Sequence, residues 1–149
     1  MILQHEPFAQ CIDEGQRLLQ AHYKEIAWRQ DKIPLAIDRE AYLRMDMEGK
    51  LMIFTARDSG RLVGYAAWFV NKHPHYKTTQ YAVNDVIYVD PESRGGLGIR
   101  LIKFSEKSLR ETGVSVVVLH IKKILDWSLM AERLGYELTD LVHQKWIGA

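Results

Sequence analysis

The sequence predicts an α/β fold in which a mixed, mostly antiparallel β-sheet carries helices on both faces. Runs typical of strands and runs typical of helices alternate along the chain. Two β-rich runs between Leu51 and Asn71 meet at Asp58-Ser59-Gly60, which is a hairpin signal. A glycine-rich loop then joins a later strand directly to an amphipathic helix. With 149 residues, 47% of them hydrophobic, the chain is the size of one domain, residues 1–149.

In the first half of the chain, helical spacing of apolar side chains predicts a helix over residues 7–30. A second, shorter helix is predicted over residues 38–47, with Asp38 as its N-cap and Gly49 as its stop. The two runs of the hairpin follow, and residues 78–90 form a further predicted strand.

In the second half, a helix is predicted from residue 98 to residue 112, where Gly113 ends it. The apolar run VSVVVLHI predicts a strand that is buried on both faces. Residues 123–134 then favour a helix with Gly135 at its C-terminus, and residues 136–147 favour a last strand.

Composition excludes several classes of protein. The formal net charge of +1 gives no strongly basic field, so a nucleic-acid partner is not indicated. A single cysteine, Cys11, makes no internal disulfide, and no run approaches the 18 apolar residues typical of a membrane span. The first residues, MILQHEPFAQC, lack the basic and apolar regions of a signal peptide. We therefore expect a cytoplasmic protein.

The glycines between the strand and the helix, Gly95, Gly96 and Gly98, predict an anion site. Unpaired N–H groups and the helix dipole attract anions to a helix start, and glycines let a ligand approach the backbone. The spacing does not match GxGxxG, and Ile99 and Arg100 do not supply the Lys-Ser/Thr of a P-loop. A tight turn without a ligand is the alternative.

The strand before this loop holds one acid, Asp85, within the apolar stretch AVNDVIYV. Because strand side chains alternate, Asp85, Ile87 and Val89 are expected on one face. An acid that faces a cleft could take a proton from an ammonium group; the alternative is a solvent-facing residue at a strand edge. His22 and Glu25, near the end of the first helix, are further candidates, with a solvated helix end as their alternative.

The segment around the loop resembles motif A of the GNAT acyltransferase superfamily, a strand ending in V-x-P-E followed by R-G-x-G-x-G/A. Val89, Pro91, Glu92, Arg94 and Gly95 match this pattern. The later segment W-x-x-x-A-E-R-L-G-Y extends the resemblance over most of the chain. Among GNAT proteins the chain resembles most closely small proteins encoded by tailed bacteriophages, which implies the cytoplasm of the infected cell.

This resemblance implies a GNAT-like sheet with a central splayed parallel pair of strands, and direct transfer of an acetyl group from acetyl-CoA to an amine. We expect catalytic roles for Asp85, His22 and Glu25. The thioester would lie along the strand before the loop, and a homodimer is left open. The residues expected to bind acetyl-CoA are Ile87, Tyr88, Val89, Arg94, Gly95, Gly96, Leu97, Gly98 and Ile99.

Two positions depart from the family pattern. The loop is one residue short and has Leu97 where a glycine is expected, and Ala131 stands where many members have a tyrosine that protonates the thiolate. Two alternatives therefore stay open. One is a phage GNAT-like enzyme that modifies nucleobases with a metal held by His22, His75 and Asp85. The other is a phage component that keeps the fold without catalysis. The main interpretation includes no metal.

Overall fold

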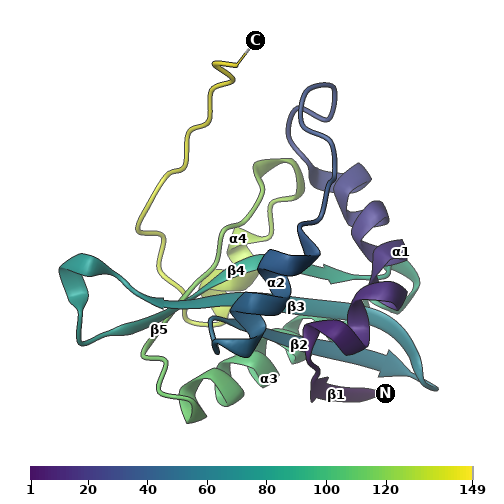
Figure 1. Cartoon of the computed structure of the whole chain (residues 1–149), viewed down its shortest axis with the longest axis horizontal. Helices are drawn as coiled ribbons and strands as arrows, with labels where there is room; N and C mark the ends of the chain where they lie inside the picture. The colour runs from purple at the N-terminus through teal and green to yellow at the C-terminus, as the bar shows by residue number, and fades with distance from the viewer. Residues whose placement is uncertain (149) are drawn as a thin grey trace.

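The structure is a computed structural model that describes residues 1–148. Its centre is a five-stranded sheet in the order β1-β2-β3-β4-β5 (Figure 1). The first four strands pair antiparallel, and β4 pairs parallel with β5. This confirms the predicted mixed sheet and the hairpin. The strand bounds are β1 Ile2–His5, β2 Leu51–Asp58, β3 Arg61–Lys72, β4 Gln80–Val89 and β5 Val116–Val118.

Helices lie on both faces of the sheet, as predicted (Figure 1). The helix α1 (Phe8–Ile26) and the helix α2 (Arg39–Met47) cover one face, while α3 (Leu97–Glu111) covers the other. The short helix α4 (Ser128–Arg133) follows β5. In α2 the Asp38 side chain accepts a hydrogen bond from the Ala41 N–H at 3.0 Å, which confirms the predicted cap. No helix within residues 1–148 has the length and apolar character needed to cross a membrane.

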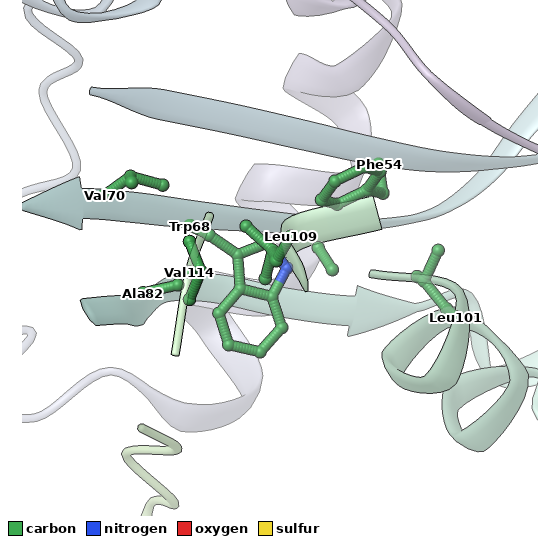
Figure 2. Close-up of a cluster of buried hydrophobic side chains, with 8 residues drawn as sticks. Phe54, Trp68, Val70, Ala82, Leu101, Leu109 and Val114 are labelled. Carbon is green, nitrogen blue, oxygen red and sulfur yellow. The ribbon is translucent and has the colours of Figure 1, made fainter. Parts of the chain in front are cut away.

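Each face of the sheet has its own apolar core. On the α3 side, Trp68 and Phe54 are fully buried and pack with Leu101 and Leu109 of α3 (Figure 2). On the α1 side, side chains of β2 and β3 meet the N-terminal half of α1 and the helix α2. Alternation along β2 divides the two cores, because Ile53 faces α1 whereas Phe54 faces α3.

The first helix is shorter than predicted. It ends at Ile26 rather than at residue 30, because the Gln30 side-chain amide donates to the carbonyls of Tyr23, Lys24 and Ala27. These bonds help to satisfy the carbonyls at the helix end, of which the Tyr23 carbonyl also accepts from the Ala27 N–H. The segment that continues to Asp38 contains no helix and crosses the α1 side of the molecule.

The C-terminal predictions are wrong in three respects. The strand β5 has only three residues, which are half-buried rather than buried on both faces. The predicted helix over 123–134 is divided into a 3-10 turn, Lys123–Leu125, and α4, because Asp126 between them has an extended backbone; its carboxylate accepts from the Ser128 N–H at 2.8 Å. Gly135, at φ 95°, does end α4.

The third error is the last strand, since residues 136–148 contain no strand. Their apolar side chains Leu138, Leu141, Val142 and Ile147 are exposed. A strand requires a partner edge, and this segment pairs with none in the described part of the chain. The parallel pair β4–β5 therefore lies at one side of the sheet instead of at its centre. The four-residue strand β1 was not predicted.

Candidate active site

A β-bulge places Asp85 on the α1 side of the sheet. Along the β3–β4 pair, Ala67 faces Val86 but Trp68 faces Asn84, so Asp85 has no partner. The extra residue breaks the alternation: Asp85 receives a hydrogen bond from the α2 residue Tyr42, with 2.5 Å between the hydroxyl and Oδ2. Ile87 and Val89 pack on the α3 side. The prediction that all three share one face is therefore wrong.

Asp85 lies at the wall of a cavity of about 250 Å³ between α1, α2 and the sheet. Burial raises the pKa of Asp85 above its usual range, while the hydrogen bond from Tyr42 opposes that rise. A carboxyl group with a raised pKa holds a proton more readily near neutral pH than an exposed aspartate does. The geometry and the direction of the shift both suit a proton acceptor.

His22 is buried behind this cavity. Its Nδ1 lies 3.2 Å from the hydroxyl of Tyr65, and its ring stacks on Tyr88 with 4.9 Å between centroids. Burial lowers the pKa of His22 to about 4, so the imidazole is neutral at pH 7. Tyr65, whose side chain lines the cavity, stands between His22 and the cavity.

Glu25 is engaged with the loop instead of with the cavity. Both of its carboxylate oxygens accept hydrogen bonds from Arg94 Nη2, at 2.9 and 2.8 Å. The Arg94 Nε donates to the Val89 carbonyl at 3.1 Å, and its guanidinium lies over the Tyr88 ring. This arginine holds the glycine-rich loop against the C-terminal end of α1.

The start of α3 is open. Gly96 is its N-cap residue at φ 85°, no side chain caps it, and its first turn has no acidic residue. The N–H groups of Gly95, Gly96, Gly98 and Ile99 meet no acceptor within residues 1–148. Four free donors at a helix N-terminus, where the dipole is positive, make a site suited to phosphate groups.

The shortened loop keeps this site free of side chains. A Cβ atom added to Gly95 or Gly96 would meet nothing within 4 Å, so the space beside the loop is open. The Leu97 side chain, where the family pattern has a glycine, is 3% exposed and packs on Val89 in the core. Its bulk therefore points away from the solvent side of the loop.

The edge of β4 beside this loop is also open. β4 pairs with β5 only from Tyr81 to Val83, and farther along it has no strand partner on that side within the described residues. The Asn84 side chain bridges the two segments at the end of the ladder. Its Nδ2 donates to the His120 carbonyl at 3.2 Å, and its Oδ1 accepts from the His120 N–H at 2.6 Å. Beyond this bridge the strands separate.

The sequence model of the Acetyltransferase (GNAT) family matches residues 16–136. The chain belongs to this family. The predicted membership of the GNAT superfamily is thereby confirmed. No curated protein sequence matches the chain.

Solved acetyltransferase structures share the fold. A GCN5-related N-acetyltransferase from Ralstonia eutropha has a TM-score of 0.79 at 19% identity, over 99% of each chain. An aminoglycoside acetyltransferase from an uncultured soil metagenomic sample has a TM-score of 0.75 at 18% identity, over 99% of this chain and 96% of the other. A Clostridium acetobutylicum acetyltransferase solved with acetyl-CoA has 0.67 at 16%, over 98% and 97%. At these identities the likeness shows the fold.

The structure also bears on two further predictions, the missing tyrosine acid and the metal site. Ala131, at the position of the family's tyrosine acid, is 5% exposed on α4 and offers no proton. The structure does not bring together the three residues of the metal alternative, which are His22, His75 and Asp85. His75 lies in the connection between β3 and β4, and no group of three metal-ligating side chains forms within residues 1–148.

The sequence did not predict the contacts that Tyr42 and Asn84 make at the site. The Tyr42–Asp85 contact joins residues 43 positions apart, and the Asn84–His120 contact joins residues 36 positions apart. No local signal in the sequence joins such pairs.

Proposed function

We propose that this GNAT protein transfers an acetyl group from acetyl-CoA directly to an amine. The observation that carries the proposal is the open start of α3, whose free N–H groups suit the pyrophosphate of CoA. The open edge of β4 continues from it and suits the extended arm that bears the thioester. The Clostridium acetobutylicum neighbour, solved with acetyl-CoA, supports this assignment. Acetyl-CoA supplies an activated acetyl thioester.

Asp85 is the proton acceptor in this proposal. The acceptor amine enters as an ammonium ion, gives one proton to the Asp85 carboxylate, and thereby gains the lone pair that forms the new C–N bond. The C–S bond breaks, and its electron pair stays on sulfur. Once the amide bond forms, the nitrogen loses its second proton and the departing thiolate gains one. The products are therefore an amide and a free thiol. Asp85 then returns its proton to solvent.

Asp85 suits this role better than His22 or Glu25. Asp85 lines the cavity, whereas His22 is separated from it by Tyr65, and Glu25 is paired with Arg94. The Glu25–Arg94 pair positions the loop and takes no part in proton transfer.

Backbone groups on the open edge of β4, in the stretch Ile87 to Val89, are proposed to hold the thioester carbonyl; the peptide groups of Tyr88 in this stretch face β3. The Asn84–His120 bridge sets where the strands separate and thus where this edge becomes free. Because Ala131 offers no proton, water is proposed to relay the second proton of the amine to the departing thiolate. The cytoplasmic location and the phage origin stay predictions.

A matched pair of substitutions at Gly95 tests the proposal. Its backbone does not adopt positive φ, and a Cβ there meets nothing within 4 Å, so larger residues should fold. Gly95→Glu places a negative charge beside the expected pyrophosphate, and Gly95→Gln adds the same bulk without charge. Calorimetric titration with acetyl-CoA should show at least tenfold weaker binding for Gly95→Glu than for Gly95→Gln.

Absence of acetyl-CoA binding by the unaltered protein would refute the proposed function. Equal affinities of the two Gly95 variants, with binding intact, would instead refute the placement of the pyrophosphate at this loop. A melting temperature for each variant serves as the folding control, because a negative charge at a helix N-terminus should not destabilise the fold.

A further inference from the structure

The cavity next to Asp85 has walls that are mostly apolar. Side chains from α1, from the segment before α2 and from the sheet line it. Its volume of about 250 Å³ gives room for a small organic molecule. The apolar lining includes Phe8, Ile12, Leu19, Leu35, Ile37 and Val86.

Charge is almost absent from this lining. Asp85 is its only ionisable carboxyl group, and no lysine or arginine lines it. The nearby Glu6 is buried and engaged: it accepts hydrogen bonds from Thr55 and from Arg57. A ligand with several positive charges would therefore find one countercharge in the cavity, and its other charges would face apolar side chains at a desolvation cost.

The remaining polar groups of the lining are three hydroxyls and the Cys11 thiol, and each has a partner. Tyr42 donates to Asp85, Thr55 donates to Glu6, and the Tyr65 hydroxyl lies 3.2 Å from His22. Because Tyr42 and Thr55 already donate their hydroxyl protons, the lining offers few partners for the many hydroxyl and amino groups of a sugar-based acceptor. A ligand that fits must be apolar apart from one group that meets Asp85.

We infer that the acceptor is a small primary amine with one positive charge and an apolar chain or ring, its ammonium at Asp85 and its body among the cavity side chains. This inference rests on the proposed acetyl transfer and names the class of its acceptor. Phenethylamine, with one amine and one apolar ring, belongs to this class. Polyamines, aminoglycosides and peptide N-termini do not match the lining.

The segment between α1 and α2 forms the rim of the cavity. Leu35 lines the cavity and is 41% exposed, so it lies between the interior and solvent. Ile33 is also 41% exposed but does not line the cavity. The two positions give a matched pair: Leu35→Asp adds a charge at the rim, and Ile33→Asp adds the same charge two residues away.

The test compares kcat/KM for phenethylamine, spermidine, kanamycin and a short peptide with a free N-terminal alanine, all with acetyl-CoA. We expect phenethylamine to exceed the other three at least tenfold. Leu35→Asp should lower its kcat/KM about tenfold, whereas Ile33→Asp should stay within twofold. Preference for a polycation or the peptide, or equal effects of the two variants, would overturn the inference while acetyl transfer itself stands.

Calorimetry separates this inference from the proposed function. If acetyl-CoA does not bind, the proposed function fails, and phenethylamine alone is then titrated into the protein. Binding that Leu35→Asp weakens and Ile33→Asp leaves unchanged would support a cavity for apolar amines. If phenethylamine binds neither with acetyl-CoA nor without it, the inference of a cavity for apolar amines is overturned.

Discussion

Replacing Tyr42 by phenylalanine is expected to raise the pKa of Asp85 further. The Tyr42 hydroxyl donates to Asp85 Oδ2 at 2.5 Å, and this bond favours the ionised carboxylate. Its ring stacks on Phe8 with 5.2 Å between centroids, and phenylalanine keeps that contact. The substitution therefore removes one hydrogen bond and little packing.

The size of the effect follows from the strength of that bond. A hydrogen bond to a charged group contributes about 1.5 to 3 kcal/mol, and one pKa unit corresponds to about 1.4 kcal/mol. Loss of the bond should thus raise the pKa of Asp85 by about one to two units. Because Asp85 must be ionised to accept a proton, the acidic limb of the pH profile of kcat/KM should move upward by the same amount.

Carbon-13 NMR titration of the Asp85 carboxyl group measures the shift without a substrate, and the pH profile of kcat/KM measures it during turnover. Tyr136→Phe is a matched control, because the Tyr136 hydroxyl donates to Glu106 at 2.6 Å and neither residue lines the cavity. An Asp85 midpoint that stays in place or moves to lower pH in Tyr42→Phe would refute this reasoning.

Three further outcomes are expected. Asp85→Asn should lower kcat at least tenfold with an unchanged acetyl-CoA Kd by calorimetry, and an unchanged rate at all pH values would remove Asp85 from the mechanism. Arg57 lowers the pKa of Glu6 from 4.5 to about 2, so the stability from this pair is present above about pH 5 and is lost as pH falls toward 2. Urea unfolding should therefore show Glu6→Gln less stable by about 3 kcal/mol at pH 7, with a gap that narrows in acid; a constant gap would contradict this. Burial raises the pKa of the Cys11 thiol to about 12, so it should react with a disulfide reagent at pH 8 only in denaturant, and fast reaction of the native protein would contradict its burial.

Features that depend on neighbouring residues could be predicted from the sequence. The Asp38 cap needs only the Ala41 N–H three residues later, and the Asp58-Ser59-Gly60 turn joins adjacent strands. The open loop before α3 is equally local, because its glycines and the helix start are contiguous. Such signals carried the mixed sheet, most helices and the open loop before α3.

Features that depend on two distant segments could not be predicted in this way. The face on which Asp85 lies depends on a bulge, which is a property of the register between β3 and β4 and not of either strand alone. The Tyr42 contact joins residues 43 positions apart. The predicted last strand failed for a similar reason, since a run with strand-like composition forms a strand only where a partner edge is present.

The helix α1 connects the two halves of the candidate site. Its N-terminal and middle turns supply Phe8, Ile12 and Leu19 to the cavity wall, and its last turn supplies Glu25, which holds Arg94 at the start of the glycine-rich loop. A displacement of α1 would thus alter the acceptor cavity and the anion site together. Because Arg94 is held by Glu25 and the Val89 carbonyl, the proposed anion binding at the loop depends chiefly on backbone N–H groups, whose directions follow from the position of that loop. In the proposed function, the helix that shapes the cavity for the amine therefore also positions the donors for acetyl-CoA.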